Sequence, residues 1–156
     1  MTGKSGNAAE IDARSGFEQV RALARGEYPT SPMTKLIPFD TEMPEKKGHL
    51  RFRATPDKTH LNGFGVVHGG WAMTMLDNAM GLAAHSMVEA GEFCPSTETT
   101  VKFLGKIEAT GEALTVTADV LRQEGRLFFL EGSIRASDGK ELATGKSTCK
   151  LVSKKA

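Results

Sequence analysis

The pattern of apolar and polar residues along this chain changes from a helical period to a strand period. Apolar residues recur at helical spacing between residues 17 and 24 and predict a short amphipathic helix. A proline-free stretch over residues 69–90 predicts one long helix, and Gly91 is placed to end it in the left-handed conformation. Because this stretch is apolar on nearly every side, we expect the long helix to be buried.

Strand patterns occupy most of the remaining chain. Residues 35–52 predict two strands joined by a turn near residues 46–48. After the long helix, strand patterns fill four segments: residues 97–104, 113–121, 127–136 and 141–152. Asp138 and Gly139 between the last two segments are typical of a hairpin turn. One long helix against an antiparallel sheet defines an α+β fold, and a helix that is apolar all round needs cover on its far side as well.

Length and composition predict a single domain. The chain has 156 residues, of which 39% are hydrophobic and 25% charged, as in ordinary globular proteins. We expect a disordered tail over residues 1–14 and one domain over residues 15–156. The formal net charge of +1 gives no reason to expect nucleic acid or an anionic membrane as a partner. No apolar run reaches the roughly 18 residues of a membrane span, and the N-terminus lacks a hydrophobic signal region, so we expect a cytoplasmic location.

Two kinds of site are not expected from this sequence. The four histidines, His49, His60, His68 and His85, have no paired ligand spacing, so no metal site is predicted. The chain has no Gly-x-Ser-x-Gly motif of the kind that positions a catalytic serine. Cys94 and Cys149 form no Cys-x-x-Cys motif and are expected to be reduced thiols.

Two chemically opposite groups occur on the predicted long helix. The start of the helix carries His68-Gly69-Gly70, where free backbone N–H groups and the positive end of the helix dipole suit a developing oxyanion. Asp77 is a single acid in an apolar stretch, where an unpaired charge is costly. These groups are therefore the first candidates for chemistry.

The spacing of these groups separates them within one chain. Gly69 and Asp77 are eight positions apart, which is about 12 Å along a helix, and His68 and Asp77 differ by about 900° of rotation. One substrate carbonyl cannot contact both ends of this helix. If both groups serve one reaction, two chains must contribute, and a twofold dimer with antiparallel neighbouring helices is the natural arrangement. Such a dimer would also cover the second apolar face of the helix.

The order of these motifs resembles that of a known family. Asn62 and Gly65, then residues 68–70, then Asp77-Asn78, are similar to the hot-dog-fold acyl-CoA thioesterases, and most of all to the phenylacetyl-CoA thioesterase (PaaI-like) subgroup. The resemblance extends over residues 48–152. It implies a hot-dog fold, in which a six-stranded antiparallel sheet wraps around one long central helix, and a homodimer that commonly pairs into a homotetramer.

The resemblance also implies roles for individual residues. Asp77 would be the nucleophile, or the general base that activates water. The N–H of Gly69, from the partner chain, would form the oxyanion hole, and the partner's His68 and Asn62 would orient the carbonyl or the water. A Ser or Thr on the strand after the helix would position water; Ser96 and Thr97 both fit, and Ser96 is preferred.

Acyl-CoA is the expected substrate and partner, and coenzyme A enters only as part of that substrate. Arg122 matches a basic position that contacts the nucleotide part in relatives. The further expected substrate contacts are Gly70, Thr97, Arg126 and Lys150. The methionines of the long helix could line an acyl pocket or pack in the core.

Other interpretations stay open at the level of sequence. Asn62 is also typical of a turn, and His68 could satisfy a local backbone group. The protein could be a hydratase acting on an enoyl thioester, or a dimer that binds acyl-CoA without catalysis. The acyl group is not identified, and aryl-acyl and medium-chain groups both fit.

Overall fold

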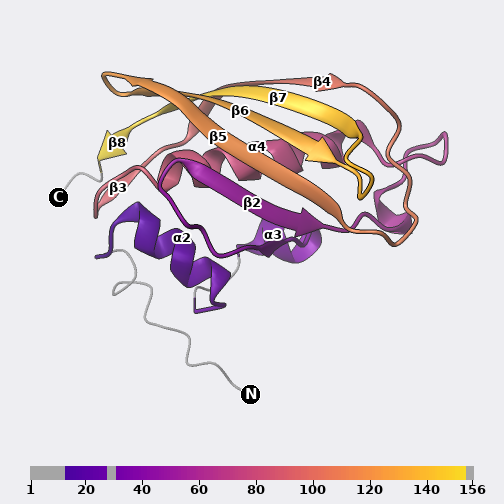
Figure 1. Ribbon diagram of the computed structural model, residues 1–156, viewed down its shortest axis with the longest axis horizontal. Coiled ribbons are helices and arrows are strands. Elements are labelled where there is room, and N and C mark those ends of the chain that lie inside the picture. The colour runs from indigo at the N-terminus through magenta and orange to yellow at the C-terminus, as the bar shows by residue number, and fades with distance from the viewer. Residues whose placement is uncertain (1–12, 28–30, 154–156) are drawn as a thin grey trace.

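The sheet and the long helix dominate the computed structural model, which describes residues 13–27 and 31–153 (Figure 1). The tail expected over residues 1–14 falls outside this part of the chain, except for its last two residues. The sheet is antiparallel, with the order β1-β2-β5-β6-β7-β4. Its strands are β1 (Asp40–Thr41), β2 (His49–Ala54), β4 (Ser96–Phe103), β5 (Leu114–Glu124), β6 (Leu127–Arg135) and β7 (Glu141–Lys150). The expected α+β fold is confirmed, with helix α4 (Gly69–His85) at its centre.

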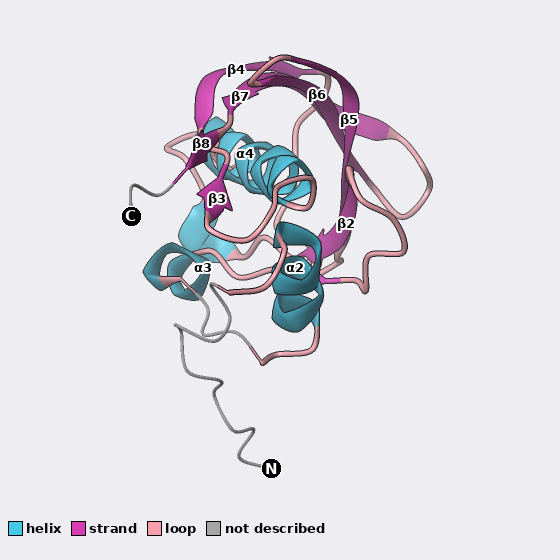
Figure 2. Cartoon of the chain, turned by 90° about the vertical axis from the view of Figure 1, so that its left-hand side faces the viewer, coloured by secondary structure: helices cyan, strands magenta, loops and turns pink. Residues whose placement is uncertain are grey.

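The sheet curves around α4, which packs against its strands β5, β6 and β7 (Figure 2). Trp71, Met75 and Leu76 are among the buried residues on the sheet side of the helix. Gly145 on β7 faces this side, and a Cβ placed there would lie 3.1 Å from the Cε of Met80. The glycine therefore lets the helix approach the sheet more closely than a larger residue would allow.

The side of α4 that carries Asp77, next to the edge strand β4, is only half-buried in the single chain. Thr74, Asp77 and Asn78 point away from the most buried positions and are half-buried, and nothing lies within 4 Å of a Cβ placed at Gly81. Eight of the 17 residues of α4 are buried, so the single sheet covers only part of the helix, as expected. The single chain leaves this face partly open along a stripe of small and polar residues.

The helix also ends five residues earlier than predicted. Ser86 is its C-cap, and its hydroxyl donates to the carbonyl of Ala83 at 2.7 Å. The same Oγ accepts a hydrogen bond from the backbone N–H of Gly48 at 2.7 Å. These contacts tie the helix end to the turn before β2. Gly91 does have a positive φ of 78°, but it lies after the C-cap Ser86 and does not end the helix.

The N-terminal helix predicted over residues 17–24 is confirmed as α2 (Gly16–Ala24). Its first residue docks on the segment after α4, where the N–H of Gly16 donates to the carbonyl of Val88 at 2.9 Å. A Cβ at Gly16 would lie 1.8 Å from the backbone oxygen of His85, so only glycine fits this contact.

Four short elements were not predicted as separate elements. Helix α3 (Pro32–Leu36) lies partly within the segment expected to hold the first strand; Ser31 caps it and Pro32 is at its first turn, a signal that the sequence does contain. The 3₁₀ helix η1 spans Lys58–His60. Strands β3 (Glu92–Phe93) and β8 (Val152–Ser153) pair with each other in a small second sheet, which depends on a contact between distant segments.

Candidate functional site

The start of α4 carries the first half of the candidate site. His68 is the N-cap, and its Nδ1 accepts a hydrogen bond from the backbone N–H of Gly70 at 2.8 Å. The ring therefore satisfies a local backbone group, as the simpler interpretation proposed. The N–H of Gly69 makes no hydrogen bond to any described residue, which leaves it able to bind a ligand oxygen. A Cβ at Gly69 would lie 3.1 Å from the ring of Phe103 on β4.

Asn62 shapes the loop that leads into this helix. Its Oδ1 accepts hydrogen bonds from the N–H groups of Phe64 at 2.9 Å and Val66 at 3.4 Å. The loop is closed by an isolated bridge between Leu61 and Val67. Asn62 is thus a turn residue, as its sequence context also suggested. In one chain it acts on the site indirectly, by shaping the loop that delivers His68.

Asp77 provides the second half of the candidate site. It is half-buried on α4, and its Oδ1 accepts a hydrogen bond from the hydroxyl of Thr99 at 3.1 Å. We expected Ser96 or Thr97 to position water near this acid, and the hydroxyl that the structure brings to Asp77 is instead that of Thr99, which the sequence analysis did not single out. Ser96 and Thr97 are exposed, and neither hydroxyl bonds to Asp77 in the described chain.

The register of β4 explains why Thr99, and neither Ser96 nor Thr97, contacts Asp77. A bulge lies between Ser96 and Glu98, so Thr97 leaves the regular alternation and its hydroxyl donates to the carbonyl of Thr148 at 3.0 Å. Beyond the bulge, alternate residues from Thr99 to Phe103 face the helix. Counting back from the apolar residues Val101 and Phe103 would have indicated Thr99 as the inward hydroxyl.

A chain of polar groups continues behind Thr99 into the core. Its Oγ1 lies 3.0 Å from the Oγ of Ser147, which in turn lies 3.8 Å from the sulfur of Cys149. A hydrogen bond to Cys149, and next burial, raise the pKa of Cys94 far above its ordinary value. The same hydrogen bond lowers the pKa of Cys149, against an opposing effect of burial. The two cysteines, distant in sequence, therefore meet beside the acid.

The two halves of the site lie at different points along β4. Asp77 lies beneath Thr99, and Gly69 lies beneath Phe103, four residues further along the strand. Four residues of strand span about 13 Å, which agrees with the roughly 12 Å between these positions along α4. Within one chain, the acid and the helix N-terminus remain apart.

The expected contacts for coenzyme A lie on the surface. Arg122 is exposed, pairs with Glu124 at 2.6 Å, and stacks 4.0 Å from the ring centroid of Phe129. It lines a groove of about 240 Å³ together with Lys146. The Nε of Arg126 donates to the carbonyl of Leu151 at 3.0 Å, so this side chain is partly engaged.

Lys150 is exposed at the end of β7, while its backbone N–H bonds to the carbonyl of Pro95 at 2.9 Å. Gly70 is half-buried next to Gly69, and its N–H is taken up by His68. The structure thus brings neither residue into direct contact with Asp77 in one chain.

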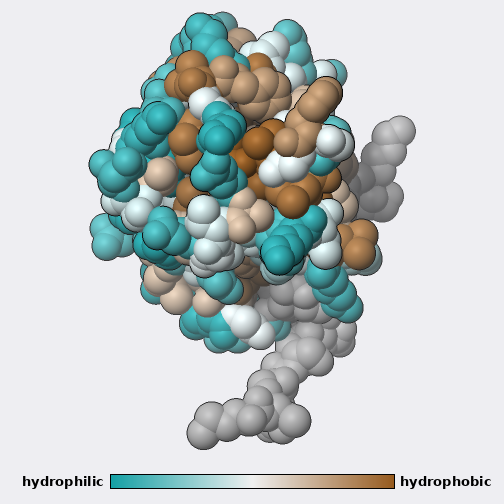
Figure 3. Space-filling view, turned by 90° about the vertical axis from the view of Figure 1, so that its right-hand side faces the viewer, coloured by the Kyte–Doolittle hydropathy of each residue, from teal (hydrophilic) through white to brown (hydrophobic). Residues whose placement is uncertain are grey.

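Apolar side chains are exposed around the start of α4. Phe103 is 55% exposed, Leu104 48% and Met73 45%, and Phe64 on the preceding loop is 93% exposed. Figure 3 shows apolar side chains gathered on this end of the molecule. Four exposed large apolar residues close to one helix terminus are typical of an interaction surface.

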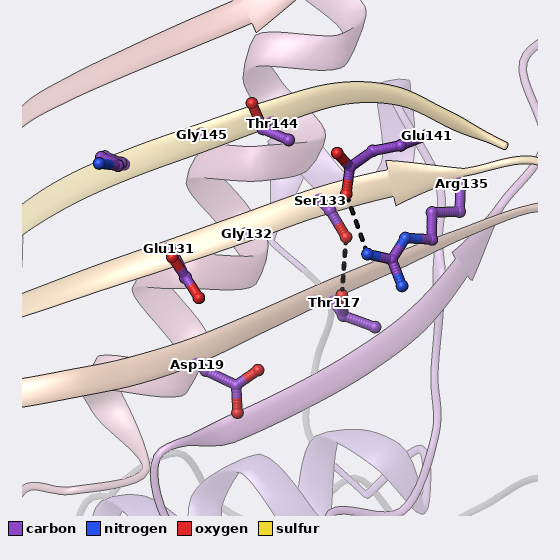
Figure 4. Close-up of a pocket in the computed structure, with 10 residues that line it drawn as sticks. Thr117, Asp119, Glu131, Gly132, Ser133, Arg135, Glu141, Thr144 and Gly145 are labelled. Atoms are coloured by element: carbon purple, nitrogen blue, oxygen red, sulfur yellow. Dashed lines mark hydrogen bonds and ion pairs between the residues drawn. The ribbon is translucent and has the colours of Figure 1, made fainter. Parts of the chain in front are cut away.

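A second hollow, of about 450 Å³, lies on the outer face of the sheet (Figure 4). It is lined by charged and hydroxyl side chains, and Arg135 pairs there with Glu141 at 2.9 Å. The helix passes behind the sheet in this view, so the hollow and Asp77 lie on opposite faces. No described residues form a cluster of three or more His, Cys, Asp or Glu side chains that could hold a metal. Nor does the described chain contain a helix that is long and apolar enough to cross a membrane.

The fold and the arrangement around α4 define a class of enzymes. The model of the thioesterase superfamily matches residues 64–143, which include the start of α4, Asp77 and Thr99. The chain belongs to this superfamily, and it is a thioester hydrolase with the hot-dog fold. The family predicted from the motif order is thereby confirmed.

Several solved structures share this fold. A phenylacetic acid degradation-related protein of Ralstonia eutropha JMP134 is 25% identical, with a TM-score of 0.76, and the match covers 84% of this chain and 98% of that one. The PaaI protein of E. coli is 24% identical, with a TM-score of 0.76 and coverage of 90% and 96%. A Streptococcus mutans UA159 protein bound to acetyl-CoA is 20% identical, with a TM-score of 0.67 and coverage of 76% and 91%. No curated protein matches the chain.

Proposed function

We propose that two copies of this chain form an acyl-CoA thioesterase whose active sites lie between the subunits. The observation that carries this proposal is the position of both half-sites along one strand. The acid lies beneath Thr99 and the helix N-terminus beneath Phe103. An antiparallel copy of this strand from a partner chain can therefore place the acid of each chain beside the helix N-terminus of the other.

Strand β4 is suited to this pairing. It is an eight-residue edge strand, and β7 is its only neighbour within the described sheet. An open edge of this length is a template for another strand. If two copies pair antiparallel about Val101, Thr99 of one lies opposite Phe103 of the partner subunit. Neighbouring strands are about 4.8 Å apart, so Asp77 comes near Gly69 of the partner subunit, and the exposed apolar residues at this end are covered.

The two half-sites then supply complementary chemistry. The N–H of the partner's Gly69 and the positive end of its helix stabilise the oxyanion that forms on the thioester carbonyl. Asp77 acts on the carbonyl carbon, either directly or through water. Thr99 orients the carboxylate by donating to Oδ1. The reaction needs no cofactor, because coenzyme A is the leaving group.

Coenzyme A is the proposed carrier of the acyl group, and Arg122 is its proposed contact. The exposed guanidinium offers a cation to the phosphates, and the Streptococcus mutans structure, which shares the fold, contains acetyl-CoA. The acyl groups that we propose to test first are aryl-acyl and medium-chain groups. We also propose a homodimer that can pair into a homotetramer; mass measurement in solution would give two or four times 16.8 kDa.

A mixed-dimer experiment tests the shared site. Gly69→Pro removes the proposed oxyanion donor, and the backbone accepts proline here because Gly69 is the first residue of the helix and His68 before it is extended. Gly69→Ala, which keeps the N–H but places the same Cβ 3.1 Å from the ring of Phe103, is the steric control. Asp77→Asn removes the acid. Gly69→Pro and Asp77→Asn should each be inactive alone, whereas their mixed dimer keeps one complete site out of two and should recover activity.

Co-expression with two different affinity tags isolates the mixed dimer, and release of free thiol from CoA thioesters measures its activity. A mixed dimer as inactive as its parents would contradict a site shared between subunits. Consumption of an enoyl-CoA without thiol release would indicate a hydratase, and binding of CoA thioesters without turnover would indicate a binding protein.

A further inference from the structure

Ser147 is a buried hydroxyl residue next to Thr99, which contacts the proposed acid Asp77. It is only 5% exposed, on the helix-facing side of β7, and it lies directly opposite Thr99 in the register of β4 and β7. Its Oγ lies 3.0 Å from the Oγ1 of Thr99 and 3.0 Å from the backbone oxygen of Glu98. Ser147 makes no hydrogen bond to Asp77 within the described residues, so its influence on the acid passes through Thr99.

Counting hydrogens fixes how these groups can be arranged. Thr99 has one hydroxyl hydrogen, and an ionised carboxylate only accepts, so this hydrogen goes to Oδ1 of Asp77. The oxygen of Thr99 is then free to accept. Ser147 also has one hydrogen, and three acceptors lie within reach: the oxygens of Thr99 and Glu98, both at 3.0 Å, and the sulfur of Cys149 at 3.8 Å. When Ser147 donates to Thr99, the three side chains form one directed chain that ends on the carboxylate.

The cysteines supply the other end of this chain. A hydrogen bond to Cys149 raises the pKa of Cys94, so the Cys94 thiol is the donor of that bond. The Sγ of Cys149 lies 3.8 Å from the Oγ of Ser147, and either atom can be the donor. When Cys149 donates to Ser147 and Ser147 donates to Thr99, each of these side chains uses its single hydrogen once. Hydrogen bonds in such a series polarise one another, which strengthens the last bond to the acid.

We propose that Ser147 is a positioning residue for thioester hydrolysis, which holds the hydroxyl of Thr99 in the orientation that donates to Oδ1 of Asp77. This role rests on the proposed function. With Oδ1 occupied, Oδ2 is the oxygen that takes a proton from the attacking water. The water oxygen bonds to the thioester carbon, and the carbonyl electron pair moves onto oxygen. Collapse of this oxyanion breaks the C–S bond, and the proton on Asp77 passes to the departing sulfur.

The test compares two similar buried serines. Ser147→Ala removes the hydroxyl behind Thr99. Ser133→Ala is the matched control, because Ser133 is 9% exposed on the neighbouring strand β6 and bonds to the hydroxyl of Thr117 at 3.1 Å, far from the acid. Loss of one net hydrogen bond corresponds to a fall of about 2- to 12-fold. We expect a fall of this size in kcat for Ser147→Ala, an unchanged KM, and no change in either constant for Ser133→Ala.

A second measurement does not depend on activity. The carboxyl carbon resonance of Asp77, assigned by its loss in Asp77→Asn, should move in Ser147→Ala and stay in place in Ser133→Ala. If the wild-type enzyme releases no thiol, the proposed function is wrong. The resonance still shows whether Ser147 and Asp77 are coupled. An unmoved resonance, or a kcat in Ser147→Ala equal to that of the control variant, would overturn the role of Ser147.

Discussion

Replacing Thr99 with valine tests the contact that sequence reasoning missed. Valine has nearly the same shape as threonine, so the change removes the hydroxyl that donates to Asp77 at 3.1 Å and little else. Ser147 keeps an acceptor in the carbonyl of Glu98, so no buried donor is left unpaired. A hydrogen bond to a charged group contributes about 1.5–3 kcal/mol. If the bond is fully used in the transition state, kcat falls about 10- to 150-fold.

The assay is the release of free thiol from a panel of CoA thioesters, which includes phenylacetyl-CoA, hydroxybenzoyl-CoA and a medium-chain acyl-CoA. Ser96→Ala and Thr97→Val are the controls, because these residues carry the hydroxyls expected from sequence and both are exposed. We expect both controls to retain wild-type kcat, and thermal unfolding should show that all three variants fold. Wild-type turnover in Thr99→Val together with a loss in Ser96→Ala would refute the assignment, and would restore the original expectation.

Three further predictions follow from the same geometry. Arg122→Ala should raise KM for CoA thioesters more than it lowers kcat, because the guanidinium lies in a surface groove; an unchanged KM would remove Arg122 from the binding site. Gly145→Ala should destabilise the fold by about 1–3 kcal/mol, measured by chemical denaturation, because the new methyl group would lie 3.1 Å from Met80; equal stability would show that the helix can shift at no cost. Cys94 should resist alkylation at pH 8 until the chain unfolds, since a hydrogen bond to Cys149 and then burial raise its pKa; rapid labelling of the native protein, read by mass spectrometry, would contradict this.

Local signals in the sequence were enough to place the proposed acid and oxyanion donor. His68 before two glycines marks the helix start, and the spacing from Gly69 to Asp77 alone shows that one chain cannot bring the two together. The strands after the helix were also predictable, because alternation and turn residues act over a few neighbouring positions. These features depend on the nearest residues along the chain, so no tertiary information is needed to find them.

Tertiary structure decided what surrounds the acid. Because of the bulge in β4, Thr99 and neither Ser96 nor Thr97 contacts Asp77. The pairing of β4 with β7 places Ser147 next to Thr99. Such choices depend on the register between segments about fifty residues apart, and a shift of one residue reverses which face each side chain occupies. The same reason explains why the sequence contains no local sign that Cys94 and Cys149 interact: Cys94 lies just before β4 and Cys149 on β7, and only the pairing of these two strands brings the residues together.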